Sequence, residues 1–567
     1  MWNVTAEAGI KTLVWHWPGS SWPPSSSNEN LYVIDGTQPE GVNCGNTVVE
    51  SEKILIADEK TPDIKYRAKA ATDSKVPCFI TGMEFDEEEL DDALATLCGN
   101  GCRQATSGDA ECLSKLPMDV IYSPIRLATG WMNAPADAKE CIMIHSKSLI
   151  RRPCLILKNA KGIYDTMQIF ANKKEVEPIA TLKVGEYVKD IIDDAILEKN
   201  DERIKVSRNM RILEMAEDGS HIRMWISNAM DFHNDTLWYP KSLLPEIINN
   251  VGYPQPCSVG GGQDVQLVED VMRATWEVAG EWTADSIKYL IKEYGFQMVF
   301  SHFHNIDLQG HMLVQFLKNG NSSLDAATIQ RLFREVYIQT DRYIGHYMDM
   351  LDDDWTIMIV SDHGQTCPEY HMSTLLTGAD NYNARQMVDW GYTVLKEDEN
   401  GKQEVDWSKT KAVMWRMGEV WLNLKGRDFH DGVEGIVTPE ERWQLEEEIM
   451  THILSEKSPM TGMRMATLAL RNKDAVVLGM GGPGCGDIVY LAAEGYTMDH
   501  ADSLSTIDGA IGTSCMSIFA AAGPGIRENF RTPRVIHHVD VTPTIATLLG
   551  TRMPEQCEGA PVYQILK

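Results

Sequence analysis

The strongest constraint on the fold is a pattern that occurs twice in the middle of the chain, a long helical segment followed by a short apolar strand. A helical pattern that begins at residue 264 leads into the strand QMVFSHF (297–303), and a second helix at 325–351 leads into WTIMIVSD (355–362). Apolar strands that alternate with helices are typical of a parallel sheet covered on both faces. The pattern therefore predicts an α/β fold with a mostly parallel sheet between helical layers.

Both ends of the chain continue the α/β pattern. Further apolar strands are expected at 11–17, 31–35, 487–493 and 516–523. The segment 539–550 is predicted to be a closing helix, because Pro543 lies in its first turn and Gly550 just past its end. The core is therefore expected to use residues from the start, the middle and the end of the chain.

Two stretches interrupt this pattern. Residues 140–228 consist of short apolar runs separated by charged turns, which predicts an inserted sheet, and 380–480 looks like a second insertion with its own helix and strands. We therefore divide the chain into an N-terminal part of the α/β core (1–84), a β-rich insertion (85–245), a central core with candidate metal ligands (246–380), a smaller α+β cap (381–480) and a C-terminal part of the core (481–567).

The charge of the chain limits its partners. The sequence has 52 Lys and Arg against 82 Asp and Glu, a net charge of −30. Nucleic-acid polymers and anionic membrane surfaces need clustered basic residues, so neither is an expected partner. No apolar run of about 18 residues occurs, and no membrane span is predicted. An anionic small molecule would therefore need a local source of positive charge, for which a bound metal is the obvious candidate.

The cysteines and the first residues bear on location. The 12 cysteines are spread thinly, which favours reduced cytosolic thiols over a disulfide framework. The closest pair, in CGNGC (98–102), lacks the second tight pair of a zinc knuckle and is interpreted as a loop. No signal peptide is visible, so a cytoplasmic location is expected, although an N-terminal truncation would remove such a signal.

Asp and His residues follow three of the predicted strands. Asp307 and His311 come after 297–303, Asp362 and His363 come directly after 355–361, and the loop after 487–493 ends at His500. In open parallel sheets the chemistry collects beyond the carboxyl ends of the strands. Carboxylate and imidazole together are typical Zn²⁺ or Mn²⁺ ligands. Their joint placement predicts a metal site.

Other histidines nearby compete for this role. His302 and His304 alternate along one strand, so one of them is expected to be buried and structural. His371 is a further competitor. His537 and His538 precede the last helix and are interpreted as capping or packing residues. The tryptophans at 15, 17 and 22 are expected to pack in the core and at its rim rather than to stack on a ligand.

Several of these segments resemble the alkaline phosphatase superfamily. The segments are IDLQGH, VSDHG, MDHADSLS and the C-terminal SIFAAAGPGI…HHVDVTPTIATLLG. The closest resemblance is to the type I phosphodiesterase/nucleotide pyrophosphatase branch and related bacterial phosphohydrolases. The opening WNVTAEAGIKTLVWHWPGS is similar to that branch's segment just after the nucleophile, and NLKGRDFHDGVEGIVTPEE to a later one. Residues 85–245 remain largely unmatched.

The resemblance implies two divalent metal ions, Zn²⁺ first and Mn²⁺ as the alternative. Asp307, His311 and His500 would hold one ion, and Asp362 and His363 the other. Where some relatives place the last histidine, this chain has Gly-Thr-Ser-Cys (512–515).

In the family, an Asp and a Thr or Ser nucleophile from the first part of the fold complete the second site. No convincing equivalent is found in this sequence. Asp35-Gly36-Thr37 mimics the strand-Asp-Gly pattern, but it falls after the WHWPGS segment and is interpreted as structural. The nucleophile is therefore unassigned, and the chain is expected to be the larger C-terminal part of a longer enzyme or to start at an internal Met.

The function that the resemblance implies is metal-dependent hydrolysis of a small-molecule phosphate ester, a diester or a nucleotide-type pyrophosphate, by in-line displacement at phosphorus. Two alternatives remain open. One is a phosphomutase or a sulfatase-like hydrolase of the same superfamily. The other is an inactive metal-binding protein, because the nucleophile segment is absent. No oligomeric state is predicted.

Overall fold

The computed structural model describes most of the chain outside several loops. The described residues are 1–17, 22–35, 47–61, 69–71, 74–78, 119–146, 149–197, 200–258, 264–318, 324–364, 384–397, 403–415, 418–427, 432–458, 461–493 and 517–567. The predictions made for Gly36, Thr37, His371, His500 and the segments 98–102 and 512–515 lie outside these residues.

The first sheet joins the start of the chain to its middle. Its order is β17 (Trp238–Tyr239), β2 (Leu31–Ile34), β1 (Thr12–Trp15) and β18 (Met298–Ser301). β1 is parallel to both β2 and β18, whereas β17 pairs antiparallel with β2. The predicted α/β class is thus confirmed as a mixed α/β structure, and the strands expected at 11–17, 31–35 and 297–303 are present.

Apolar side chains on both faces of this sheet are buried. Leu13 and Trp15 point to a cluster with α3 (Leu243–Asn250) and α5 (Ala274–Tyr294). Val14 points the other way, to a cluster with residues of α1 (Trp2–Glu7) and α11 (Val541–Leu549). Successive side chains of a strand alternate between faces, and so a strand that is apolar throughout needs cover on both.

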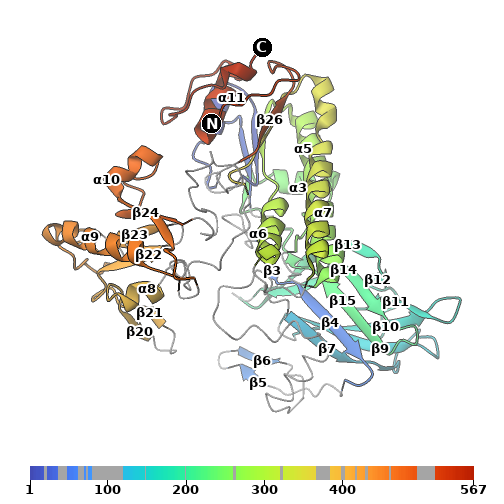
Figure 1. The fold of residues 1–567 in the computed structure, drawn as a ribbon. Helices are drawn as coiled ribbons and strands as arrows, with labels where there is room; N and C mark the ends of the chain where they lie inside the picture. The colour runs from blue at the N-terminus through green and yellow to red at the C-terminus, as the bar shows by residue number, and fades with distance from the viewer. Residues whose placement is uncertain are drawn as a thin grey trace.

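The predicted helices lie alongside this sheet. α4 (Val265–Leu267), the π-helical η2 (Val268–Arg273) and α5 follow one another without a break, and Gly295 ends α5 in a left-handed conformation with φ 69°. α6 (Asn305–Lys318) follows β18, and α7 (Ala326–Gly345), which Asp325 caps, precedes η3 (Met348–Asp353). α5 and α7 form the two long helices of Figure 1.

One core strand has a different partner from the one expected. β19 (Ile357–Val360) pairs antiparallel with β26 (Phe519–Ala522) in a two-stranded sheet. The prediction of one mostly parallel sheet that includes both 297–303 and 355–362 is therefore wrong for the described strands. β26 alternates between half-buried and exposed residues, as a strand with one solvent-facing side does. The apolar character of 355–362 indicated a strand but not its partner, and all four residues of β19 are half-buried rather than buried.

The β-rich part of the chain consists of two larger sheets. The first has the order β12 (Ala180–Lys183), β11 (Tyr164–Ile169), β10 (Ile150–Lys158), β9 (Lys139–His145) and β8 (Arg126–Leu127). The second has the order β3 (Val48–Glu50), β16 (Ala229–Met230), β14 (Glu202–Met215), β15 (His221–Ile226), β4 (Lys53–Asp58) and β7 (Asp119–Pro124), and β13 (Tyr187–Leu197) also pairs with β14. A separate hairpin joins β5 (Lys69–Ala71) to β6 (Ser74–Cys78).

This part begins earlier in the chain than expected. β3 and β4 fall within 1–84, which the sequence assigned to the α/β core, yet β4 pairs with β15 and β7 in the β-rich sheet. The run KILIAD is apolar on both faces, which suits a central strand of the α/β core or of the β-rich sheet. Only its pairing with other strands shows to which of the two it belongs.

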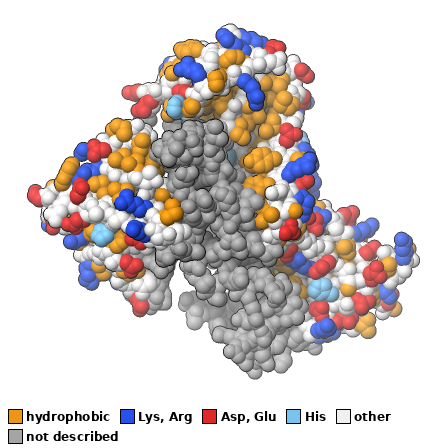
Figure 2. All heavy atoms as spheres, viewed as in Figure 1, with side chains coloured by type: hydrophobic (Ala, Val, Ile, Leu, Met, Phe, Trp, Pro, Cys, Tyr) orange, Lys and Arg blue, Asp and Glu red, His pale blue; other side chains and the backbone are white. Residues whose placement is uncertain are grey.

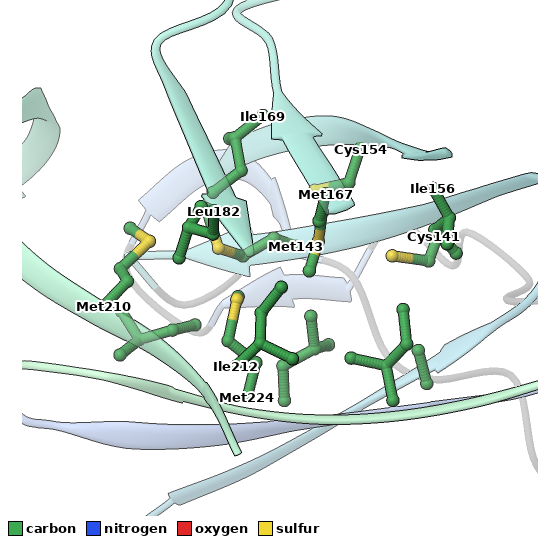
Figure 3. Packing of buried hydrophobic residues seen from close by; sticks show 14 of the residues in the cluster. Cys141, Met143, Cys154, Ile156, Met167, Ile169, Leu182, Met210, Ile212 and Met224 are labelled. Atoms are coloured by element: carbon green, nitrogen blue, oxygen red, sulfur yellow. The ribbon is translucent and has the colours of Figure 1, made fainter. Parts of the chain in front are cut away.

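The two β-rich sheets pack face to face. Figure 3 shows Met143, Cys154 and Met167 from one sheet meeting Ile212 and Met224 from the other, and all five are fully buried. Met side chains are flexible enough to fill irregular gaps between two twisted sheets. The β-rich part therefore has a core of its own.

A second compact unit contains most of the predicted cap. Its sheet has the order β22 (Ala412–Trp415), β23 (Glu419–Leu422), β25 (Ile488–Ala492) and β24 (Ala466–Arg471). With it occur α8 (Ala384–Asp389), the hairpin β20 (Leu395–Glu397) and β21 (Gln403–Val405), α9 (Pro439–Ser455), α10 (Asn472–Ala475) and η5 (Val476–Leu478). The unit is drawn in gold to orange in Figure 1.

β25 corrects another expectation. The sequence placed 487–493 in the α/β core, but β25 pairs antiparallel with β23 and β24 in the cap sheet. All five residues of β25 are buried, so it reads as a core strand in any context. The C-terminal part continues through η6 (His538–Asp540), α11 and η7 (Tyr563–Ile565), and the closing helix predicted at 539–550 is confirmed.

The surface carries mixed charges. On the face drawn in Figure 2, Lys and Arg side chains are interspersed with Asp and Glu. No helix among the described residues is long and apolar enough to cross a membrane.

Candidate active site

The parallel pairing of β1 and β18 brings two histidines to one edge of the first sheet. Trp15 is in register with Ser301, so the residues that follow, His16 and His302, leave the sheet side by side. The amide of His302 donates to the carbonyl of Trp15 at 3.3 Å, which extends the pairing by one residue. This edge is formed by the carboxyl ends of both strands, where open α/β sheets place their sites.

His16 is buried and has an unusual backbone. His16 is only 5% exposed. Its φ is 53°, a left-handed value that few residues other than glycine adopt. Burial, and then the proximity of His302, lowers the pKa of His16 to about 3. The imidazole of His16 is therefore neutral at physiological pH.

His302 and His304 form a hydrogen-bonded pair. The Nδ1 atom of His304 lies 3.3 Å from Nε2 of His302. Burial, and then the neighbouring His304, lowers the pKa of His302 to about 4, while a hydrogen bond to the backbone of His16 acts in the opposite direction. A bond that raises an imidazole pKa is one that the ring donates, so the carbonyl of His16 accepts it.

Asp307 lies between two histidines from different segments. Its Oδ2 is 3.6 Å from Nε2 of His304, and its Oδ1 is 3.2 Å from Nε2 of His363. Asp307 occupies the first turn of α6, where the helix dipole favours a carboxylate.

Buried amides hold the start of α6 in place. Asn305 donates to Gln339 of α7 and accepts a 2.7 Å hydrogen bond from Gln309. Gln339 in turn donates to the carbonyl of Arg273 at 2.7 Å. All three amide side chains are buried, so the position of Asp307 is set by packed helices.

The loop after β19 supplies the third segment. His363 donates from Nδ1 to the carbonyl of Gly364 at 2.7 Å, which turns Nε2 toward Asp307 and leaves it 3.7 Å from Oδ2 of Asp362. The hydrogen bond with Asp307 raises the pKa of His363 to about 9 against the opposing effect of burial. Nε2 of His538 lies 2.7 Å from the carbonyl of Ser361 and ties the C-terminal part to this loop.

Three of the five predicted metal ligands are therefore brought together, namely Asp307, Asp362 and His363. His311 lies on α6, four residues and about one turn beyond Asp307, and His500 lies outside the described residues. Among the described residues, no group of three His, Cys, Asp or Glu side chains is placed so that it could hold a metal ion.

His302 and His304, of which one was expected to be buried and structural, are both half-buried and hydrogen-bonded to each other. His16, which lies beside them at the sheet edge, was not singled out from the sequence. These three histidines could have been found from their position at the ends of predicted strands, where the candidate ligands also lie. His537 and His538 behave as expected, since His537 caps η6 and His538 packs against the β19 loop.

The tryptophans behave as packing residues. Trp15 is fully buried and lies edge-to-face with Trp238, with ring centroids 6.0 Å apart. Trp17 and Trp22 are partly buried in the cluster that contains Phe300.

Comparison with protein families places the chain in a known family. Residues 218–513, just over half of the chain, match the model of the family described as type I phosphodiesterase / nucleotide pyrophosphatase. This chain belongs to that family. The matched region contains Asp307, His311, Asp362, His363 and His500. No curated protein and no protein of known structure shows significant similarity to the chain. The family indicates a hydrolase of phosphodiesterase or nucleotide pyrophosphatase type.

Proposed function

We propose that this chain is a metal-dependent hydrolase of small phosphate esters, with a two-metal site that includes Asp307, His311, Asp362, His363 and His500. The observation that carries the proposal is the contact between Asp307 and His363. These residues come from two segments, and each was assigned to a different metal ion, yet Oδ1 of Asp307 lies 3.2 Å from Nε2 of His363. Two ions held by these segments would lie close together, as in known two-metal hydrolases.

The side chains fit such ions in chemical type. Imidazole and carboxylate are the usual nitrogen and oxygen ligands of Zn²⁺. Zinc bonds of about 2.0–2.2 Å at a tetrahedral angle separate two ligand atoms by about 3.3–3.5 Å. The separations around Asp307 and His363, between 3.2 and 3.7 Å, bracket this range. These nitrogen and oxygen atoms are close enough for two of them to bind the same metal ion without a large rearrangement.

In this proposal the protein orients its ligands through backbone and amide contacts. The bond from Nδ1 of His363 to Gly364 selects the tautomer whose Nε2 faces Asp307. The buried amides of α6 and α7 keep Asp307 at the sheet edge. Divalent cations, when bound, would supply the positive charge that stabilises phosphate oxygens as charge builds on them. The attacking residue is unassigned.

The test compares the chain with Asp307→Asn. We expect the metal-loaded protein to hydrolyse bis(p-nitrophenyl) phosphate, and Asp307→Asn to lower turnover by ~100-fold or more, the scale of losing one group that stabilises transition-state charge. Metal content, measured by mass spectrometry after dialysis, should fall in parallel. The matched control is Asp341→Asn, which removes an exposed carboxylate of α7 and should change neither quantity.

Two outcomes would contradict the proposal. Faster turnover of p-nitrophenyl sulfate than of the phosphodiester would favour a sulfatase-like enzyme. Bound metal with no turnover of the phosphodiester, of p-nitrophenyl phosphate or of the sulfate would favour an inactive metal-binding protein.

A further inference from the structure

We propose that Cys141 and Cys154 form a reversible cross-strand disulfide when the protein is exposed to a hydroperoxide. The two thiols lie in the core of the β-rich part, on the neighbouring strands β9 and β10. Neither residue belongs to the candidate active site, so this modification site does not depend on the proposed hydrolase activity.

The first argument is the register of the two strands. Cys141 and Cys154 are directly opposite each other in the antiparallel pairing of β9 with β10. Side chains of directly opposite residues lie on the same face of a sheet. Here that face is the one packed against the second β-rich sheet, because both cysteines belong to the cluster between the sheets (Figure 3).

The second argument is the distance between the two backbones. The neighbouring pair is Pro153 and Ile142, and Pro153 has no N–H to donate to β9. The carbonyl of Pro153 accepts from the amide of Phe170 at 3.0 Å, and the amide of Ile142 donates to the hydroxyl of Ser123 at 2.8 Å, so both groups turn away from the ladder. Hydrogen-bonded and non-hydrogen-bonded pairs alternate, so the cysteines are a hydrogen-bonded pair. The Cα atoms of such a pair are about 5.5 Å apart, a separation typical of disulfides.

The third argument is the direction of the Cys154 thiol. Its Sγ donates to the carbonyl of Arg152 at 3.3 Å. Arg152 pairs with Met143 as the next hydrogen-bonded pair of the ladder, so this carbonyl faces β9 and the sulfur lies on the β9 side of its strand. The amide of Met143 donates to the same sulfur, and a hydrogen bond with the Cys141 thiol, followed by burial, raises the pKa of Cys154.

Cys141 is the thiol that reacts first. It is 5% exposed, whereas Cys154 is fully buried, so an oxidant that enters during local opening of the sheets reaches Cys141 first. The hydroperoxide takes two electrons from the Cys141 sulfur, which becomes a sulfenic acid, and is reduced to an alcohol or to water. The Cys154 sulfur then attacks the Cys141 sulfur. The S–S bond forms as the S–O bond breaks, and the thiol proton leaves with the hydroxyl as water.

The disulfide should make the β-rich part more stable. It joins two adjacent strands in the middle of a five-stranded sheet and closes a short covalent ring, which restricts the unfolded chain. Because buried thiols ionise poorly, the reaction is expected to be slower than that of exposed thiols and to respond to prolonged oxidation. A dithiol reverses the reaction by thiol–disulfide exchange.

The experiment maps the link in the folded, full-length chain. The protein is reduced, freed of reductant, treated with hydrogen peroxide, denatured in N-ethylmaleimide and digested with trypsin. Trypsin cuts after Lys147 and Arg151, so the two cysteines fall on separate peptides, and mass spectrometry detects their joined mass less two hydrogens. We expect this pair to be the main link, to disappear with dithiothreitol, and to raise the melting temperature by about 5 °C.

A variant separates the two chemical steps. Cys154→Ala keeps a small apolar side chain in the core. We expect Cys141 in this variant to stop at the sulfenic acid, which dimedone traps, and the melting temperature not to rise. Cys257→Ala is the matched control, since it removes another buried cysteine that lies outside the strands, and it should keep both the link and the rise. Mapping of the unmodified chain carries the test if Cys154→Ala fails to fold.

Three outcomes would overturn the inference. Full labelling of both thiols by maleimide after prolonged peroxide treatment would show that they do not react. A link that forms only when the chain is oxidised in urea would show that the folded state keeps the two sulfurs apart. Oxidation of Met143 before any link forms would show that an oxidant entering this core reacts elsewhere.

Discussion

At the scale of single residues, the candidate site depends on strand register and backbone conformation, which could not be predicted from the sequence. His16 and His302 meet because β1 and β18 are parallel and in register, and His16 leaves its strand with a left-handed backbone. Near the C-terminus, a close approach between two backbone segments is likewise not predictable from the sequence. Gly559 lies against Val539 in η6, the short helix that carries His538 to the carbonyl of Ser361.

We expect Gly559→Ala to destabilise the C-terminal part. A Cβ atom at this position would lie 1.9 Å from the carbonyl oxygen of Val539, and that backbone atom cannot turn away as a side chain can. The expected loss is about 1–3 kcal/mol of unfolding free energy, as for overpacked interiors. Thermal unfolding measures it. Gly484→Ala is the control, because its Cβ meets nothing within 4 Å, and equal melting temperatures for the two variants would contradict the prediction.

At the scale of elements, helix ends are among the features that short sequence patterns predict best. Thr438 and Glu441 form a capping box at the start of α9, and Pro439 occupies its first turn. The amide of Thr438 donates to the Glu441 carboxylate at 2.9 Å, and the amide of Glu441 donates to the Thr438 hydroxyl at 3.4 Å. Such local signals require no knowledge of the tertiary fold, and a helix was expected within 380–480.

Thr438→Ala should fray the first turn of α9. Loss of an N-cap side chain leaves helix amides without an acceptor and costs about 1 kcal/mol. Hydrogen–deuterium exchange of peptides that cover the start of α9 measures this local stability. Thr451→Ala makes the same substitution inside the helix, where Thr451 bonds only to the carbonyl of Glu447, and should not accelerate exchange there. Similar acceleration in both variants would argue against the cap.

At the scale of the whole molecule, the β-rich part buries charge between its sheets. His145 is fully buried with Glu50 and Asp193 each 3.8 Å from one of its ring nitrogens. Arg208, also fully buried, pairs with Glu50, and Arg152 donates to Asp193 at 2.6 Å. Burial, and then the nearby Arg208, Lys53 and Arg152, lowers the pKa of His145 well below its usual value.

The β-rich part should therefore lose stability in mild acid. His145 is neutral when folded and takes up a proton on unfolding below its unfolded pKa of about 6.5. The unfolded state then binds more protons, so the unfolding free energy falls as pH drops below about 6.5, by at most about 1.4 kcal/mol per pH unit for this one group. Hydrogen exchange of β9 and β14 at pH 8 and at pH 5 measures the change.

His145→Gln removes this titration and keeps a polar side chain. The difference between the variant and the unmodified chain at pH 8, where the histidine is neutral in both states, reports packing alone. We expect the variant to lose less stability between pH 8 and pH 5 than the unmodified chain does. The same loss in both proteins would show that His145 does not carry the acid sensitivity.

Much of the secondary structure and part of the site could be predicted from local patterns. The helices before β18 and β19, the strands β1, β2 and β18 of the first sheet and the closing helix α11 were all expected, because apolar periodicity and end signals are properties of short segments. The neighbourhood of Asp307 and His363 followed from the rule that chemistry collects at strand ends. The two-metal ligand set remains a prediction, and so do the domain limits apart from the assignments of β4 and β25.

The sequence by itself determined which segments are helices and buried strands, and that they carry Asp and His at their ends. Only the tertiary structure decided how those strands pair. β4, β19 and β25 are each apolar enough to fit into several kinds of sheet. Each pairs in a sheet other than the one expected. The same is true of His304, whose meeting with Asp307 depends on α6 being held against α7. Burial is encoded locally in apolar spacing, whereas pairing and side-chain convergence depend on contacts between residues far apart in the chain.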